Sequence, residues 1–547
     1  MKADEAIRAA LADAAARLGA PVPTVELERP RDPAHGDLST NLALVLAKAL
    51  GKKPREVAER LVATLAPPPG LVRQVEIAGP GFINFFLVEE QLHAVLPAVL
   101  AVGARWGQGE AGRGALVNVE FVSANPTGPL HVGHGRQAAL GDAIASLLEW
   151  TGWKVTREFY YNDAGAQIAN LARSVQARVL ERRGRPAELP PGGYHGEYIR
   201  DIAERYVAAH PEDPEGADLE AVRRFAVDAL RQEQDRDLQA LGVKFDVYFL
   251  ESSLYATHQV EETVRRLAAA GHTYEKDGAL WLKTTDFGDD KDRVMRKSAG
   301  KGSDYTYFLP DVAYHVTKWE RNFKRAINVQ GADHHSTATR VRIALQALGM
   351  HIPAGYPEYV LHQMVTVMQG GEEVKLSKRA GSYLTLRELI DEVGADAVRY
   401  FFLMRRADTH LVFDVDLAKS QTEENPVFYV QMAHARMSGI FRVAARDPAA
   451  VRAEGADLGA LTQPEEVDLL KELAAFPEVV QRAADTLEPH RVTGYLERVA
   501  RVAHAWYHKY RVLGEPEEAA RLVLAAGVRQ VLANGLRLLG IAAPDRM

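Results

Sequence analysis

The stretch EFVSANPTGPLHVGHGRQ, residues 120–137, decides the fold of the central part of the chain. It overlaps LVNVEFV (116–122), a short apolar run of the kind that forms a buried strand. Two prolines and a glycine then predict a turn, and the helical periodicity that follows extends from about 133 to 149. A second strand is predicted at 153–160. Strand, turn, helix and strand in this order predict a doubly wound parallel sheet.

The helix predicted after this turn begins at the sequence HVGH. Unpaired backbone N–H groups and the positive end of the helix dipole make such a terminus a site for phosphate. His131 and His134 are three residues apart, so both imidazoles project from one face of the first turn. Gly133 has no Cβ and would let a nucleotide ring lie on the backbone. The alternative is a helix start with two structural histidines.

A second candidate is GGEEVKLSKRAGSYLTL, residues 370–386, far along the chain from HVGH. Lys375 and Lys378 flank Ser377 in a segment with three glycines. Two ammonium groups on a loop suit a pyrophosphate that is held in the transition state and later released. The alternative for KLSKR alone is a solvated basic loop.

Composition limits the classes of protein that the chain can represent. The 547 residues are 47% hydrophobic and 25% charged, which is typical of globular chains and excludes collagen and disordered tails. Zero cysteines exclude disulfides and thiolate metal sites. The first residues predict an amphipathic helix too acidic for a leader, and no stretch is apolar enough to span a bilayer, so we expect a cytoplasmic protein without membrane contact. The net charge of −7 means that any RNA-binding face must be local.

The texture of the chain predicts three kinds of structure. The expected fold class is α/β, with a doubly wound, Rossmann-type parallel sheet, an α+β N-terminal domain and an all-α C-terminal helical bundle. Further strands are expected at 278–283, 325–331 and 359–367, and none after about 386. The predicted divisions are 1–110, 111–385 with an insertion around 170–290, a connecting helical segment at 386–424, and a bundle at 425–547.

HVGH and KLSKR resemble the two signature sequences of class I aminoacyl-tRNA synthetases. ANPTGPLHVGHGR, YNDAGAQI (161–168), YTYFLPDVAYH (305–315), INVQGADHH (327–335) and KLSKRAG resemble the bacterial arginyl-tRNA synthetases in particular, and the resemblance extends over essentially the whole chain. It implies ATP-dependent activation of L-arginine and transfer to the 3′-terminal adenosine of tRNA(Arg). It further implies that Mg²⁺ arrives with ATP rather than in a protein-held metal site, and we expect a monomer.

The resemblance also implies roles for particular residues. An arginine pocket fits the chemistry, because a guanidinium is planar and carboxylates accept it through two parallel hydrogen bonds. For Asp311 the alternative is an ordinary acid in the first turn of a helix, after Pro310. The implied sets are His131, His134, Lys375 and Lys378 for catalysis, Gly133, Gly331, Asp333, His334 and Ser377 for ATP, and Glu120, Ser123, Asn125, Tyr307 and Asp311 for arginine.

Two segments are candidates for RNA contact. RVARVAHAWYHKYRVL (498–513) mixes basic and aromatic residues without any acid, a combination that suits unstacked bases and phosphates. Its alternative is a bundle helix with core aromatics, and the resemblance favours anticodon binding. GPGFINFFL (79–87) resembles the family's contact with the tRNA elbow, although one or two of its phenylalanines must be core. The candidates are Arg498, Arg501, Tyr507, Tyr510 and Met547 for the anticodon and Phe82 and Asn84 for the elbow.

Two other functions remain open at this point. A nucleotidyltransferase of the HxGH superfamily shares the phosphate chemistry but needs neither a basic, aromatic helical bundle nor 547 residues. A catalytically inactive tRNA-binding relative would typically lose a signature residue, and both signatures are complete. Arginine-dependent pyrophosphate exchange distinguishes the three.

Overall fold

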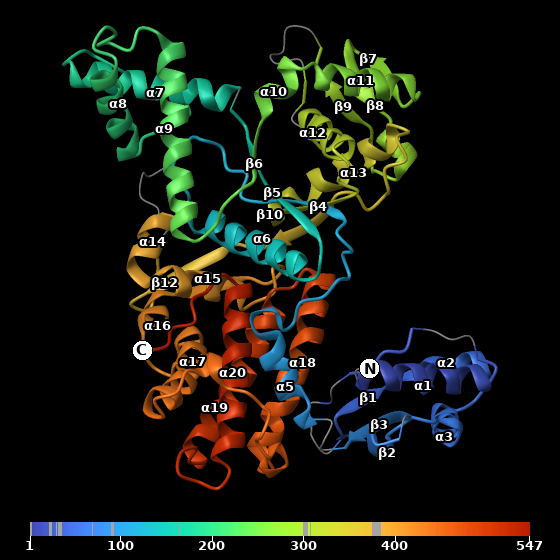
Figure 1. Cartoon of the computed structure of the whole chain (residues 1–547). Helices are drawn as coiled ribbons and strands as arrows, with labels where there is room; N and C mark the ends of the chain where they lie inside the picture. The colour runs from blue at the N-terminus through green and yellow to red at the C-terminus, as the bar shows by residue number, and fades with distance from the viewer. Residues whose placement is uncertain are drawn as a thin grey trace.

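The computed structural model describes residues 3–20, 24–28, 30, 35–67, 69–88, 92–163, 165–298, 305–306, 308–374 and 384–547. A central parallel sheet carries a helical arm and a small antiparallel lobe above it and a helical bundle below it, with an N-terminal unit beside the bundle (Figure 1). No helix of the described part of the chain is long and apolar enough to cross a membrane.

The N-terminal unit is an antiparallel sheet of order β1-β3-β2 packed with helices α1 to α3. Strand β3 turns Ile83, Phe85 and Leu87 into the core. Phe82 lies on the other face of the strand and is 40% exposed, so Phe85, not Phe82, contributes to the core. The elements are α1 (Ala3–Arg17), β1 (Leu38–Thr40), α2 (Leu42–Leu50), α3 (Pro54–Thr64), β2 (Val72–Ala78) and β3 (Phe82–Leu87).

The central sheet has five parallel strands in the order β11-β10-β4-β5-β6. This confirms the predicted α/β class. From β4 the chain builds the sheet first toward β5 and β6 and later toward β10 and β11, so the strand order reverses between β4 and β10. Ligands bind at such a reversal, outside the carboxyl ends of the strands. The strands are β4 (Leu116–Glu120), β5 (Lys154–Tyr161), β6 (Val247–Leu250), β10 (Arg325–Gly331) and β11 (Glu358–His362).

Helix α6 (Val132–Trp150) connects β4 to β5 and lies close against the sheet. A Cβ at Gly141 would overlap the ring of Phe121, so the close approach needs this glycine. Arg136 is fully buried and donates to the carbonyls of Gln363 (2.7 Å), Arg406 (2.9 Å) and Thr409 (3.0 Å). Burial lowers the pKa of this guanidinium to about 10. Two distant segments, at Gln363 and at 406–409, are thereby fixed to the helix that begins at HVGH.

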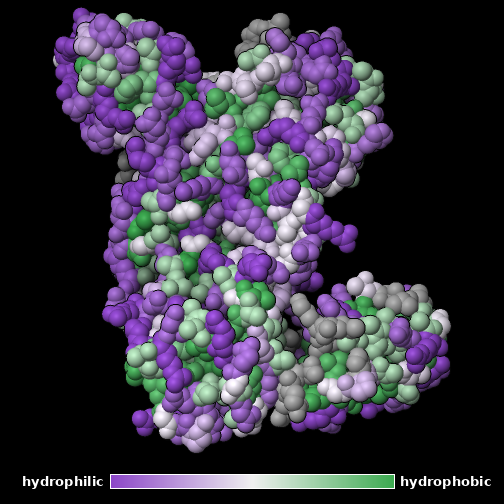
Figure 2. All heavy atoms as spheres, in the orientation of Figure 1, coloured by the Kyte–Doolittle hydropathy of each residue, from purple (hydrophilic) through white to green (hydrophobic). Residues whose placement is uncertain are grey.

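The arm and the lobe both rise from the carboxyl edge of the central sheet, and Figure 2 shows the surface hollowed between them. The predicted strand at 278–283 forms as β8 but not in the parallel sheet. It pairs antiparallel with β7 and β9, because a short turn joins it to β7 and a longer connection with a 3₁₀ helix (Thr284–Phe287) returns the chain to its other side as β9. The arm is α7 (Ala166–Arg182), α8 (Glu197–Ala209) and α9 (Leu219–Ala240). The lobe is α10 (Glu251–Ala256), α11 (Gln259–Ala269), β7 (Thr273–Lys276), β8 (Ala279–Leu282), β9 (Arg293–Arg296), α12 (Phe308–Glu320) and α13 (His335–Ala347).

A third small sheet, of order β13-β12-β14, corrects two expectations. The predicted strand 359–367 divides into β11 and β12, which belong to different sheets. The prediction of no strand after 386 is also wrong, since β14 pairs with β12. Its four residues are too few for a readable alternation, and only pairing makes them a strand. The elements are β12 (Val365–Gln369), β13 (Glu372–Glu373), α14 (Leu386–Val393), α15 (Ala395–Leu403), β14 (Leu411–Asp414) and α16 (Val415–Lys419).

The predicted C-terminal helical bundle is confirmed. Helix α5 packs on α18 and α20 in this bundle and not on the N-terminal sheet, with Leu96 against Gly527. The division at residue 110 stays a prediction, and these contacts favour a limit before residue 95. The helices are α5 (Val95–Val102), α17 (Pro426–Val443), α18 (Pro464–Thr486), α19 (His490–Lys509) and α20 (Glu518–Leu538).

Candidate active site and nucleic-acid faces

The two histidines of HVGH form a stacked pair at the start of α6. His131 is the N-cap, and its Nδ1 accepts from the Gly133 amide at 3.1 Å. His134 Nδ1 accepts from the His131 amide at 3.3 Å, and the ring centroids are 3.7 Å apart. Because each Nδ1 accepts a hydrogen bond, the neutral rings carry their protons on Nε2. The pair therefore presents two N–H donors at a helix N-terminus.

Gly133 is needed where it stands. A Cβ there would lie 3.0 Å from Cε1 and 3.1 Å from Nδ1 of His131, so a side chain would push this ring away from the cap. The sequence predicted a contact with a nucleotide ring at this glycine. The structure adds a second reason for it, which is room for the imidazole beside it.

The chain brings the end of the second signature segment to HVGH. Thr385 forms an isolated β-bridge with His131, and the Leu386 amide donates to the Leu130 carbonyl at 2.8 Å. At the start of the segment, the Gly370 amide donates to Asp416 Oδ2 at 2.6 Å. Lys375, Ser377 and Lys378 themselves lie outside the described residues, as does Tyr307. The described residues that follow the second signature thus lie against HVGH at one edge of the sheet.

Glu120, at the carboxyl end of β4, is paired within the protein. Its Oε1 accepts from Ser123 Oγ at 2.9 Å, and its Oε2 accepts from Lys318 Nζ at 2.6 Å. Glu120 is 4% exposed and the Lys318 side chain is fully buried. The ammonium therefore neutralises this carboxylate, which the sequence had assigned to substrate arginine.

Asp311 lies in the first turn of α12, and its side chain remains 28% exposed. Its Oδ1 lies 3.1 Å from Nδ1 of His315, and its carbonyl accepts from the same nitrogen at 2.8 Å. Unlike Glu120, it has no Lys or Arg ion-pair partner among the described residues. Its negative charge is available at the mouth of the site.

Asn125, in the turn before HVGH, is held by the arm. Its Nδ2 donates to Gln167 Oε1 at 2.7 Å. Gln234 of α9 donates to the carbonyls of Asn125 (3.1 Å) and Gly128 (2.9 Å). The arm thereby fixes the shape of the turn that leads into the stacked histidines.

Three polar residues in or directly after strands of the central sheet escaped the sequence analysis. Tyr160 donates from its hydroxyl to Glu251 Oε2 at 2.8 Å. Burial raises the pKa of Glu251, and the charges of Asp163 and Asp311 raise it further, against the hydrogen bond from Tyr160. The Tyr359 hydroxyl is buried without a partner among the described residues, and burial with the charges of Asp311 and Glu120 raises its pKa. The places of Tyr160 near the carboxyl end of β5 and of Glu251 directly after β6 were the available signal, whereas Tyr359, the second residue of β11, gave none.

The predicted adenosine-contacting turn follows β10. Gly331 ends the strand, and Asp333 and His334 form a single 3₁₀ turn before α13 with side chains 84% and 51% exposed. His362 pairs with Gly331 on the next strand, and burial lowers the pKa of its imidazole to about 4. An uncharged, buried histidine thus borders an open turn at the reversal of the sheet.

Three family models match successive parts of the chain: "Arginyl tRNA synthetase N terminal domain" at 1–87, "tRNA synthetases class I (R), catalytic domain" at 95–438, and "DALR anticodon binding domain" at 430–547. The arginine–tRNA ligase of Geotalea daltonii is 58% identical, covering 96% of this chain and 95% of the relative. That of Bordetella avium is 56% identical, covering 96% of each.

The chain belongs to the arginyl-tRNA synthetase family. The structure of the arginyl-tRNA synthetase from Thermus thermophilus agrees, with a TM-score of 0.77 at 25% identity, covering 99% of this chain and 100% of that one. The likeness therefore includes the N-terminal unit and the bundle as well as the sheet.

The anticodon candidates of this family member lie on α19, where the structure separates them. Tyr507 is 40% exposed and Arg501 is exposed, whereas Trp506 is fully buried. Arg498 pairs with Glu472 at 3.3 Å. The helix has no acid of its own in this stretch, but α18 supplies acids beside it.

The lower end of α19 shows the same compensation. Tyr510 donates to Glu465 Oε2 at 2.9 Å, and Lys509 pairs with the other oxygen of Glu465. Tyr510 is therefore engaged within the bundle. Of the predicted set on α19, Arg501 and Tyr507 are exposed and make no ion pair or hydrogen bond with the described residues of α18.

The C-terminal segment is fixed against α17. Its backbone carbonyls accept from Gln431 (2.9 Å, at Ala542) and His434 (2.9 Å, at Pro544), and Asp545 accepts from Ser438 at 2.8 Å. Met547, which follows, is 51% exposed. The chain end predicted to contact tRNA is thus held in place by the bundle.

The elbow candidates lie on one face of β3. Phe82 is 40% exposed, and Asn84 is 2% exposed with its Oδ1 accepting from Ser39 Oγ at 2.7 Å. Both face away from the core side of the sheet. Phe82 is open to a base, while Asn84 already has one partner in the protein.

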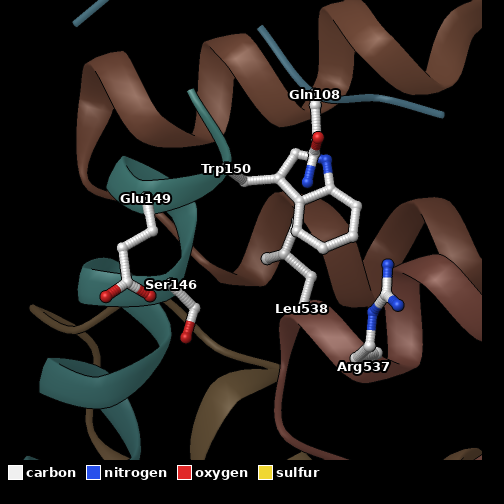
Figure 3. Close-up of a pocket in the computed structure, with 6 residues that line it drawn as sticks. All are labelled: Gln108, Ser146, Glu149, Trp150, Arg537 and Leu538. Carbon is white, nitrogen blue, oxygen red and sulfur yellow. The ribbon is translucent and has the colours of Figure 1, made fainter. Parts of the chain in front are cut away.

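A cavity of about 300 Å³ lies between α6 and α20, away from the edge of the central sheet that carries HVGH (Figure 3). Its wall includes the Trp150 indole, with the Arg537 guanidinium 4.8 Å from the ring centroid. The Trp150 Nε1 is buried without a hydrogen-bond partner among the described residues. The cavity marks the joint between the catalytic part and the bundle. It is lined by Gln108, Ser146, Glu149, Trp150, Arg537 and Leu538.

Proposed function

We propose that the chain activates L-arginine with ATP and transfers the arginyl group to the 3′-terminal adenosine of tRNA(Arg). The observation that carries the proposal is one edge of the sheet that holds both parts of the required chemistry. Two stacked imidazoles sit at a helix N-terminus beside the end of the lysine segment, and Asp311, a carboxylate without a Lys or Arg ion-pair partner among the described residues, lies in the first turn of α12. Family membership supports the same reaction.

In the first step, a carboxylate oxygen of arginine attacks the α-phosphorus of ATP, and the bond to pyrophosphate breaks. We assign His131 and His134 to the phosphates, because their Nε2–H groups and the N-terminus of α6 offer positive potential where negative charge develops. Lys375 and Lys378 would bind the leaving pyrophosphate, and Gly133, Ser377, Gly331, Asp333 and His334 would bind ATP. Mg²⁺ enters with ATP as part of that substrate.

In the second step, a ribose hydroxyl of the terminal adenosine attacks the arginyl carbonyl and releases AMP. We assign Phe82 and Asn84 to the tRNA elbow, and Arg498, Arg501, Tyr507, Tyr510 and Met547 to the anticodon arm. The divisions 111–385, 386–424 and 425–547, a cytoplasmic location and a monomeric state complete the proposal. The acidic total charge requires these RNA contacts to be local, and the exposed Arg501 and Tyr507 meet that requirement.

Pyrophosphate exchange and tRNA charging test the proposal directly. We expect arginine-dependent exchange and charging of tRNA(Arg). Exchange stimulated by a small metabolite in place of arginine would identify a nucleotidyltransferase. Tight tRNA binding without exchange, with or without tRNA in the assay, would identify an inactive relative.

Asp311→Asn should weaken arginine binding by about 1.5–3 kcal/mol, because it removes a charged acceptor for the guanidinium while keeping the shape of the side chain. The KM for arginine should rise roughly 10- to 150-fold and the KM for ATP should stay constant. Asp277→Asn, at an exposed turn of the lobe, is the matched control. An unchanged KM for arginine would remove Asp311 from the pocket.

Tyr507→Ala should cost about 1–3 kcal/mol of tRNA binding if an anticodon base stacks on the ring. The loss should disappear with a tRNA whose anticodon loop is already altered. Arg501→Ala should instead weaken binding to all tRNAs and flatten its salt dependence, because a phosphate contact releases counterions. Arg265→Ala, on α11 of the lobe with a side chain 73% exposed, is the control. If normally melting Tyr507→Ala enzyme keeps the parental ratio for the two tRNAs, the anticodon does not contact this ring.

A further inference from the structure

Six side chains form a continuous series of polar contacts beneath the candidate arginine pocket. Ser123 donates to Glu120, Lys318 donates to Glu120 and to Asn328, Asn328 contacts His315, and His315 contacts Asp311. The last three distances are 3.1 Å (Lys318 Nζ to Asn328 Oδ1), 2.8 Å (Asn328 Nδ2 to His315 Nε2) and 3.1 Å (His315 Nδ1 to Asp311 Oδ1). We call these residues the polar relay. It joins α12 to strands β4 and β10.

The lysine fixes the direction of every bond from Lys318 to Asp311. An ammonium can only donate, so the atom of Asn328 that faces it must be the carbonyl oxygen. The Asn328 amide nitrogen therefore points at His315 and donates to Nε2. Because Nε2 accepts, the proton of the neutral imidazole sits on Nδ1, which donates to the backbone carbonyl of Asp311 at 2.8 Å and lies 3.1 Å from its Oδ1. The amide orientation and the tautomer follow from one buried charge.

The relay also keeps charge at the pocket. Lys318 is fully buried, and its positive charge is neutralised by Glu120. The lysine therefore does not neutralise Asp311. His315 is fully buried too, and its Nε2 faces the amide nitrogen of Asn328 at 2.8 Å. The Asp311 carboxylate thus lies beside the N–H edge of an imidazole, with Nδ1 3.1 Å from its Oδ1, and not beside an ammonium group. It is oriented without losing the negative charge that a guanidinium requires.

We propose that His315 is a positioning residue for arginine recognition, which holds the Asp311 carboxylate toward the substrate guanidinium through a tautomer imposed by Asn328 and Lys318. This inference rests on the proposed function, in particular on Asp311 as the residue that binds the guanidinium. His315 touches neither substrate nor ATP in this arrangement. Its effect is confined to the orientation of one carboxylate.

Two substitutions separate positioning from packing. His315→Asn keeps an N–H donor close to the place of Nδ1, whereas His315→Gln places its donor near Nε2 and leaves Asp311 without one. The Gln variant should raise the KM for arginine at least tenfold, with kcat and the KM for ATP within twofold of the parent. The Asn variant should remain within threefold of the parent in all three constants. Equal KM values for the two variants would overturn the proposal.

A double-mutant cycle with Asp311→Asn gives the second readout, because coupled residues are not additive. If His315 acts through Asp311, then His315→Gln should have no further effect on the KM for arginine once Asp311 is Asn. The same fold-increase in both backgrounds would show that His315 acts by packing and would overturn the proposal. The parental enzyme is assayed in parallel. If the parent shows no arginine-dependent charging, the proposed function is wrong, and this result is distinct from a failure of the His315 proposal.

Thermal melting of each variant shows whether a large change in activity comes from the site or from a loss of folded protein. The relay is buried, so we expect a lower Tm for His315→Gln than for the parent. A raised KM for arginine with unchanged kcat cannot come from a smaller folded fraction, which would lower kcat instead. If the Gln variant does not fold, the Asn variant is compared with His315→Leu, which has no donor at all, under the same criteria.

Discussion

His134→Ala is expected to lower the rate of arginyl-adenylate formation roughly 10²- to 10³-fold, the loss seen when one preorganised donor to a developing negative charge is removed. The His134 Nε2–H projects from the first turn of α6, where the helix N-terminus adds its own positive potential. Because the partner charge develops at the transition state, the KM values for arginine and ATP should change little. Single-turnover formation of the adenylate, with tRNA present, measures the effect.

His195→Ala, which removes an exposed histidine in the loop before α8, is the matched control and should be silent. His134 also accepts from the His131 amide, so the variant loses part of the N-cap and about 0.5–2 kcal/mol of stability. Melting curves show whether the assay temperature is still safely below Tm. A well-folded His134→Ala enzyme with the parental single-turnover rate would assign the stacked pair to structure alone.

Glu158→Gln should lower the free energy of unfolding of the catalytic part by about 3–5 kcal/mol, the cost of breaking a buried ion pair from one side. Glu158 on β5 is fully buried, and Arg321 donates to both of its oxygens at 2.8 Å. Tyr314 and Asn118 donate to it as well, each at 2.8 Å. A neutral amide cannot accept all four bonds, and its own N–H donors face other donors.

Glu358→Gln is a closely matched control. Arg325 on β10 also donates two hydrogen bonds to Glu358 on β11 of the same sheet, at 2.7 and 3.1 Å. The Glu358 side chain, however, is 41% exposed. Solvent screening limits an exposed pair to about 0.2–1 kcal/mol. Urea unfolding followed by a probe in the catalytic part should therefore show a large loss for one glutamate and almost none for the other. Equal losses would contradict the assignment of Glu158 as a buried, charged residue.

The Glu158 carboxylate also predicts that the free energy of unfolding falls at acidic pH. Burial raises the pKa of Glu158, but the hydrogen bonds of Arg321 and the charges of Lys318 and Arg321 outweigh it and leave the pKa below its ordinary value. The unfolded chain therefore binds a proton at higher pH than the folded chain. The contribution is complete above about pH 4.3, the ordinary value for glutamate, and is lost as the pH falls through the folded pKa. In Glu158→Gln, the free energy of unfolding should depend less on pH in this range.

Local sequence predicted the elements that depend on local chemistry. The strand at 116–122, the turn after it and the helix from HVGH form as expected, because turn residues and helical periodicity act within a few positions. Helical periodicity also predicts helices at 218–241 and 336–349, and the bounds of α9 and α13 agree with these ranges to within about two residues. The short strand β14 and the sheet of β8 were missed, because pairing rather than propensity makes them strands.

The candidate site divides in the same way. The sequence placed His131, His134, Glu120 and Asp311 as candidates, and the structure brings them to one edge of the sheet, while their roles stay predictions. It could not show that Glu120 is neutralised by Lys318, since the two residues are 198 positions apart.

What the sequence determined by itself is the strand, turn and helix around HVGH, the parallel α/β class, the helical C-terminal part and the resemblance to a family, because motifs and periodicities are short-range properties. Only the tertiary structure decided which charges remain uncompensated. Residues 498–513 contain no acid, yet α18 places Glu472 beside Arg498 and Glu465 beside Lys509 and Tyr510. A hydrogen bond or ion pair depends on distance in space, and the distance between residues of different helices is set by packing.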